Sequence, residues 1–315
     1  MIMMPGQSYR GELPPLTLSQ QTLAQQLRTD VERIASAPHH YLAYAELVAI
    51  ADYLEDQLTD VAQQRGEVER QDYLITGQTF SNLILELPGQ QQAEEIVIIG
   101  AHYDSVDAPG GVPGANDNGS GVAAVLALAR HFAGHPQSRT LRFVAFTNEE
   151  PPFFQTETMG SLVYARRCRE REEKVVGMLS LETMGYYDDA PGSQTYPLGL
   201  LDQIYPIQGN FISFVGNLDS AKFVRQVVRQ FRESISFPSE GAILPGAVPG
   251  AGWSDHWSFW QQGYPALMVT DTAPFRYPYY HTPEDTSDKI DYERLARVVE
   301  GLVSVVTDLG GFLER

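Results

Sequence analysis

Cysteine is almost absent from this chain of 315 residues, which contains only Cys168. A single thiol excludes an intrachain disulfide, and it also excludes zinc sites built on pairs of cysteines. Any metal that the chain binds must therefore be held by histidine and carboxylate side chains.

Basic residues are also scarce, because 22 lysines and arginines stand against 40 aspartates and glutamates, a formal net charge of -18. Such a surface repels nucleic acid and anionic membranes, so we expect neither as a partner. No stretch reaches the ~18 uninterrupted apolar residues of a membrane-spanning helix. The N-terminus lacks a basic segment followed by an apolar one, as a secretory signal would have, and we expect a cytoplasmic protein.

The apolar residues form two kinds of pattern. Helical spacing predicts two helices within residues 17–58, separated at Pro38, and further helices at 121–132, 160–171, 221–234 and 292–309. Strands are predicted at 66–76 and 79–87, and short apolar runs indicate buried strands at 96–99, 141–146, 175–181 and 266–270. This alternation predicts an α/β fold, with a mainly parallel (mixed) twisted sheet and helices on both faces. We expect residues 1–315 to form a single catalytic domain, on which the helices of residues 1–60 pack.

A histidine and two aspartates follow the strand predicted at residues 96–99. Asp104 lies two residues beyond His102, so an extended backbone places both on one face, where the carboxylate can orient a ligating imidazole. A buried histidine bonded to an aspartate as local structure is the alternative.

Asp117 stands in the run GANDNGSG. That run fits either a turn and helix cap or a carboxylate whose two oxygens bridge two cations.

Three carboxylates and a second histidine come after the other buried strands. Glu149 and Glu150 follow the strand at 141–146, and two adjacent carboxylates are costly to bury unless a cation compensates them. One can bind metal while its neighbour acts as a general base; a solvated turn is the alternative. Glu182 ends a strand and His281 follows another by a loop. The whole set can hold two metal ions and a bridging water, which predicts a metal-dependent hydrolase.

Several stretches of the chain resemble the co-catalytic di-zinc exopeptidases, a family that includes bacterial leucyl aminopeptidases, glutamate carboxypeptidases and, more distantly, glutaminyl cyclases. The resemblance covers roughly residues 95–310 and is carried by IVIIGAHYDSV, GANDNGSGVAAVLALAR, LRFVAFTNEE, SLETMGYY, SDHWSFWQQGYPALMVTDT and YYHTPEDT. It implies a zinc-exopeptidase-like fold and two zinc ions as cofactors. The implied reaction is aminopeptidase hydrolysis of a peptide substrate at its N-terminal bond.

The resemblance implies five metal ligands. They are His102, Asp117, Glu150, Glu182 and His281. Asp117 would bridge the two ions, with His102 and Glu182 completing one site and Glu150 and His281 the other. The family also implies a cis peptide bond after Asp117. Many relatives have aspartate where this chain has Glu182, and a ligand set of histidines and carboxylates also suits manganese or cobalt.

The remaining implied roles concern catalysis and support. Glu149 would be the general base, and Tyr280 would polarise the scissile carbonyl unless it is an ordinary packed aromatic. Asp104 would hold His102 from outside the metal site. Asp255 would be an outer hydrogen-bonding residue and His256 a structural one.

Two long segments, 186–220 and 236–255, are rich in glycine, proline and aromatic residues and are predicted as ordered loops around a pocket. Candidate wall residues, which are otherwise core aromatics, are Phe153, Phe154, Trp253, Trp257, Phe275 and Tyr277. Glu150 or an acidic loop residue would receive the substrate's ammonium.

The rival functions are a glutaminyl cyclase with one zinc and a metal-free binding module. The sequence leaves the oligomeric state open.

Overall fold

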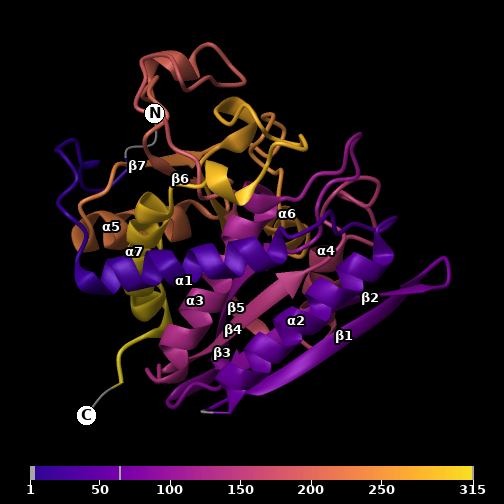
Figure 1. The fold of residues 1–315 in the computed structure, drawn as a ribbon. Coiled ribbons are helices and arrows are strands. Elements are labelled where there is room, and N and C mark those ends of the chain that lie inside the picture. The colour runs from indigo at the N-terminus through magenta and orange to yellow at the C-terminus, as the bar shows by residue number, and fades with distance from the viewer. Residues whose placement is uncertain (1–3, 64, 314–315) are drawn as a thin grey trace.

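The computed structural model describes residues 4–63 and 65–313, whose strands form one twisted sheet of eight (Figure 1). From edge to edge the order is β1-β2-β4-β3-β5-β8-β6-β7. The strands are β1 (Glu67–Ile75), β2 (Gln78–Leu87), β3 (Gln92–His102), β4 (Arg139–Phe146), β5 (Lys174–Glu182), β6 (Ile212–Gly216), β7 (Ser239–Ile243) and β8 (Ala266–Thr270).

The centre of the sheet is parallel and its two sides are mixed. Strands β4, β3, β5 and β8 run parallel to one another. Antiparallel pairs join β1 to β2, β2 to β4, and β8 to β6. The parallel strands are buried on both faces over most of their length, which explains their nearly continuous apolar sequences. The predicted mainly parallel, mixed sheet is confirmed.

Helices cover both faces of this sheet (Figure 1). One face carries α1 (Leu18–Ile34), α2 (Tyr44–Ala62), α3 (Gly121–Ala133), α5 (Ala221–Ser234) and α7 (Tyr292–Gly310). The other face carries α4 (Gly160–Glu170) and α6 (His256–Gln261). None of the helices in the described part of the chain is both long and apolar enough to cross a membrane.

The N-terminal helices pack on the first face. Helix α1 begins with a capping box, in which the Thr17 hydroxyl accepts from the Gln20 N–H and the Gln20 side chain accepts from the Thr17 N–H. Its buried residues Leu27, Val31 and Ile34 recur at helical spacing, and α1 packs against α3 and α7. Helix α2 packs against β2 and α3. The assignment of residues 1–315 to a single catalytic domain stays a prediction.

The prediction of loops over residues 186–220 and 236–255 is wrong at two places, because these segments contain β6 and β7. Each strand is five residues long and includes a glycine. Strands this short carry little periodic signal. They are stabilised by pairing with distant segments, since β6 pairs with β8 along one edge and with β7 along the other.

Candidate metal centre

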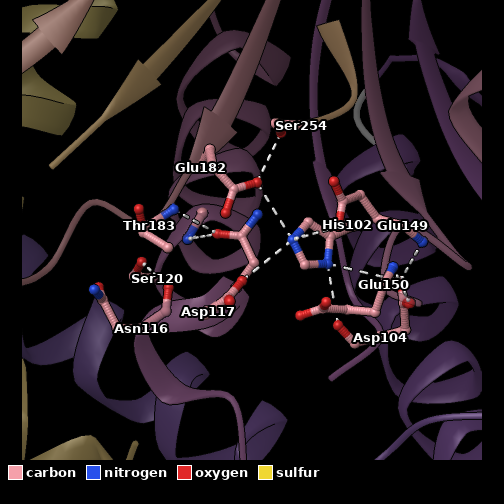
Figure 2. Close-up of polar contacts among 12 residues, drawn as sticks. His102, Asp104, Asn116, Asp117, Ser120, Glu149, Glu150, Glu182, Thr183 and Ser254 are labelled. Atoms are coloured by element: carbon pink, nitrogen blue, oxygen red, sulfur yellow. Dashed lines mark hydrogen bonds and ion pairs between the residues drawn. The ribbon is translucent and has the colours of Figure 1, made fainter. Parts of the chain in front are cut away.

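Most of the predicted site residues meet at the carboxyl ends of the parallel strands. Figure 2 shows His102, Asp104, Asp117, Glu149, Glu150 and Glu182 there. His102 and Glu182 are the last residues of β3 and β5. Glu149 and Glu150 follow the end of β4, and Asp117 lies at a non-helical kink within the turn η1 (Ala115–Ser120) before α3. This edge is where open α/β sheets bind ligands. His281 enters from the loop between β8 and α7.

The side chains form two clusters that share Asp117. In the first, His102 Nε2 lies 3.4 Å from Asp117 Oδ1 and 3.3 Å from Glu182 Oε2. In the second, His281 Nε2 lies 3.0 Å from Asp117 Oδ2 and 3.2 Å from Glu150 Oε1. Tetrahedral ligands about 2.0–2.1 Å from a zinc ion are separated by about 3.3–3.4 Å. The spacing of the donor atoms therefore fits one divalent cation in each cluster.

Unsatisfied polar atoms also point to a cation. His102 Nε2, His281 Nε2 and Glu150 Oε1 are buried and have no hydrogen-bond partner of acceptable geometry in the described part of the chain. A buried polar atom without a partner is costly, and a metal ion would satisfy all three. The donor set of neutral imidazoles and carboxylates is the one that zinc accepts.

The ionisable groups of the site shift one another's pKa values strongly. Burial alone would raise the pKa of Asp117, but His102 and His281 outweigh it and hold that pKa well below the usual range. Burial would lower the pKa of His281, but Asp117 and Glu150 raise it to about 11. Burial raises the pKa of Glu150 to about 7, with the charge of Asp117 adding to the shift. Asp117 and the two histidines thus stabilise one another's charged forms.

Glu149 stands beside the clusters without belonging to either. Its Oε2 lies 3.9 Å from His102 Nε2, and the two groups of potential ligands do not include it. Burial, together with Glu182, Glu150 and Asp255, raises the pKa of Glu149 well above its ordinary value, although His102 opposes the shift. A buried carboxylate next to the metal positions, but outside them, has the placement that a general base requires.

Asp104 contacts the Glu149–Glu150 turn more directly than it contacts the ring of His102. His102 Nδ1 lies 3.1 Å from the backbone oxygen of Asp104 and 3.7 Å from its carboxylate. The two carboxylate oxygens accept instead from the backbone N–H groups of Glu149 and Glu150, each at 3.1 Å. Asp104 thus orients the turn that carries Glu149 and Glu150, while the ring of His102 is oriented by a main-chain carbonyl.

The turn that carries Asp117 is held by two residues that the sequence reasoning missed. Asp285 accepts from the backbone N–H groups of Asn116 at 2.8 Å and Asp117 at 3.1 Å. The Asn118 side chain donates to the backbone oxygen of Leu181 at 2.9 Å. The peptide bond after Asp117 is cis, as expected. The one available signal for Asp285 was an acidic residue four positions after His281.

Glu182 is fixed by Ser254. The Ser254 hydroxyl donates to Glu182 Oε2 at 2.7 Å (Figure 2). It also lies 2.7 Å from the Ser180 hydroxyl. The contact with Ser254 orients the Glu182 carboxylate beside the first cluster.

Removing that contact should weaken metal binding. Ser254→Ala frees the Glu182 carboxylate to rotate, so we expect metal affinity to fall about 10–100-fold, measured by competition with a chromogenic chelator. Ser258→Ala is the matched control, because Ser258 is equally buried and bonds Ser161 instead. Equal affinity in the two variants would contradict a supporting role for Ser254.

The other predicted residues lie near the clusters. The Tyr280 ring stacks on His281 with centroids 3.8 Å apart, and burial raises the pKa of its hydroxyl well above the ordinary value. Asp255 is fully buried, makes no hydrogen bond to a predicted ligand, and has its pKa raised by burial to about 7. His256 Nε2 lies 2.9 Å from the Ala251 oxygen, which suits a structural role. The roles of Tyr280 and Asp255 stay predictions.

A pocket of about 790 Å³, counting its open mouth, adjoins the Glu182 side of the site. Trp253 and Phe275 line it, and their stacked rings have centroids 6.4 Å apart. The other candidate wall residues, Phe153, Phe154, Trp257 and Tyr277, lie outside this lining. Tyr277 donates instead to Asp285 at 2.8 Å, so its ring belongs to the support of the Asp117 turn.

Comparisons with known proteins identify a family for this chain. Residues 82–306 match the model of peptidase family M28. The chain is 41% identical to the uncharacterized protein YfbL of Escherichia coli (strain K12) over 246 residues, which is 76% of this chain and 75% of YfbL. It is 30% identical to aminopeptidase YwaD of Bacillus subtilis (strain 168) over 243 residues, which is 74% of this chain but only 45% of YwaD.

Solved structures show the same fold. The aminopeptidase from Aneurinibacillus sp. strain AM-1 superposes with a TM-score of 0.67 at 19% identity, covering 92% of this chain and 94% of that one. The Tannerella forsythia glutaminyl cyclase superposes with a TM-score of 0.66 at 22% identity, covering 90% of this chain and 98% of that one. The family match spans more than half of the sequence and includes every residue of both clusters. The chain therefore belongs to peptidase family M28.

Proposed function

We propose that this peptidase is an aminopeptidase that uses two metal ions, most simply zinc, to hydrolyse the N-terminal peptide bond of its substrate. One observation carries the proposal: two clusters of ligand atoms share Asp117, and a carboxylate that belongs to neither cluster lies next to them. The relative YwaD of Bacillus subtilis is an aminopeptidase, which supports the same class of reaction.

The chain's own residues divide into two sets of ligands. His102, Asp117 and Glu182 would hold one ion, and Asp117, Glu150 and His281 the other. When bound, such ions act as Lewis acids that lower the pKa of a bound water towards ~7 and polarise a carbonyl oxygen. Manganese or cobalt would suit the same ligands.

Proton transfer falls to Glu149. Its carboxylate accepts a proton from the attacking water and returns it to the departing amine. The backbone N–H groups of Glu149 and Glu150 donate to Asp104, and these hydrogen bonds fix the turn. The Glu149 carboxylate is therefore in place before substrate binds. The Tyr280 hydroxyl, which burial keeps protonated, is available to donate to the carbonyl oxygen as charge develops on it.

The surrounding surface supports an exopeptidase. The pocket beside Glu182 can take the side chain of one terminal residue. The concentration of carboxylates around the site attracts the ammonium group of a peptide N-terminus.

The test is metal content per chain, measured on protein purified without chelator, together with hydrolysis of a panel of aminoacyl-nitroanilides. We expect close to two metals per chain, with nitroaniline release that chelator abolishes and zinc restores. One metal per chain, with ammonia released from an N-terminal glutamine peptide and no nitroaniline, would replace this proposal with the cyclase. Protein that binds no metal would replace it with the binding module.

A further inference from the structure

The pocket beside the site has a floor made by four neighbouring strands. Register pairs Glu182 of β5 with Thr270 of β8, Thr270 with Ser213 of β6, and Ser213 with Glu240 of β7. All four residues line the pocket. Adjacent strands lie about 4.8 Å apart, so this row runs about 14 Å from a proposed metal ligand to Glu240.

Between its two ends the pocket is largely apolar. A second row, Met268, Val215 and Ala242, forms the rest of the floor. Tyr196 and Tyr205 line the pocket too, but their hydroxyls donate to the backbone oxygens of Pro206 and Gly241. Apart from Glu182, Glu240 is the only ionisable carboxylate among the lining residues.

Glu240 is only partly compensated by the chain's own cations. Arg232 Nη2 lies 3.7 Å from Glu240 Oε2, beyond hydrogen-bond distance, and 2.7 Å from the Ser239 backbone oxygen, to which it donates. The same guanidinium also donates to the backbone oxygens of Pro5 and Gly6. Burial raises the pKa of Glu240 although Arg232, Ser8 and Arg10 all lower it. A further cation in the pocket would therefore be favourable.

We infer that Glu240 selects substrates whose N-terminal residue carries a cationic side chain, lysine or arginine. This inference rests on the proposed aminopeptidase function and names its substrate class. The five bonds from Cα to Nζ of lysine span about 6 Å when extended, and an ion pair adds about 3 Å. These roughly 9 Å span about two of the three strand spacings, so the ammonium reaches Glu240 when the substrate's α-carbon lies over Thr270 of β8, one strand in from Glu182. The methylenes then pack on the apolar floor and the ammonium meets Glu240.

The test compares lysyl- and norleucyl-nitroanilide, whose side chains differ only by the terminal ammonium. We expect the native enzyme to prefer lysine in kcat/KM, and Glu240→Gln to reduce the lysine-to-norleucine ratio at least about tenfold. Norleucine turnover should stay within about threefold, which shows that the variant is folded. Glu233→Gln is the matched control, because Glu233 is exposed on α5, and it should leave the ratio unchanged.

Inhibition by the free amino acids gives a second readout, in which L-lysine should lose affinity for Glu240→Gln while L-norleucine does not. A native preference for norleucine, or the same ratio in Glu240→Gln as in the native enzyme, would overturn the role of Glu240 and leave the aminopeptidase standing. Metal-loaded protein that hydrolyses no member of the panel would overturn both.

Discussion

Replacing Glu149 with glutamine should lower kcat by about 10²–10⁴ while the protein keeps its full metal content. Glutamine has nearly the same shape but cannot accept a proton from the attacking water. The variant should bind metal normally, because Glu149 lies outside both clusters of ligand atoms, with its Oε2 3.9 Å from His102 Nε2.

The measurement is kcat beside metal content for the native enzyme, Glu149→Gln and Glu94→Gln. Glu94 is exposed at the start of β3, far along the strand from His102, so its variant loses the same charge without touching the site. Native kcat in Glu149→Gln at full metal content would rule out the base. Loss of a metal ion would instead make Glu149 a ligand.

The parts of this site that the sequence predicted share one physical property. His102, Glu182 and the Glu149–Glu150 pair follow strands that are buried on both faces, and such strands are recognisable because nearly every residue is apolar. Parallel strands bring their carboxyl ends to one edge, so polar residues far apart in sequence were expected to meet there. The close approach of His102 to Asp117 and Glu182 follows from that topology.

The parts that escaped prediction depend on contacts that leave no local pattern. Strands β6 and β7 are short and are stabilised by pairing with their neighbours, so the sequence did not predict them. The row of pocket residues that leads to Glu240 was missed for the same reason. Asp285 lies in a polar stretch of sequence that is typical of a solvent-exposed turn, yet the residue is fully buried. Two backbone N–H groups and the Tyr277 hydroxyl donate to its carboxylate and stabilise it there. Hydrogen bonds of this kind become visible only when the chain is folded.

Removing the metal should lower the melting temperature, and the loss should grow as pH rises from about 5 to 8. In the metal-free site, burial raises the pKa of Glu150, Asp255 and Asp285 to about 7 and that of Asp271 to about 6. These groups titrate near 4 in the unfolded chain. Between about pH 4 and 7 the folded state therefore binds more protons than the unfolded state, so its stability falls as pH rises.

Titration of the histidines also lowers the stability of the metal-free protein as pH rises, but over a higher pH range. The pKa of His281 is raised from 6.5 to about 11, so the stability that its charge contributes is complete below about 6.5 and declines above it. The pKa of Asp117 is lowered, and its contribution is lost only in strong acid, below the window considered.

Metal-loaded protein should behave oppositely, because ligation requires deprotonated carboxylates and neutral imidazoles and so strengthens as protons leave. Bound ligand adds stability in proportion to the logarithm of its concentration over its dissociation constant. Calorimetry at pH 5.5, 6.5 and 7.5, with saturating zinc and with chelator, measures the gap between the two melting temperatures. We expect that gap to widen at each step. Two results would contradict this prediction: a difference in melting temperature that narrows as pH rises, or metal-free protein that becomes more stable towards pH 7.5. Either would mean that the buried carboxylates do not destabilise the metal-free protein when they ionise, and that the two clusters are not cation sites.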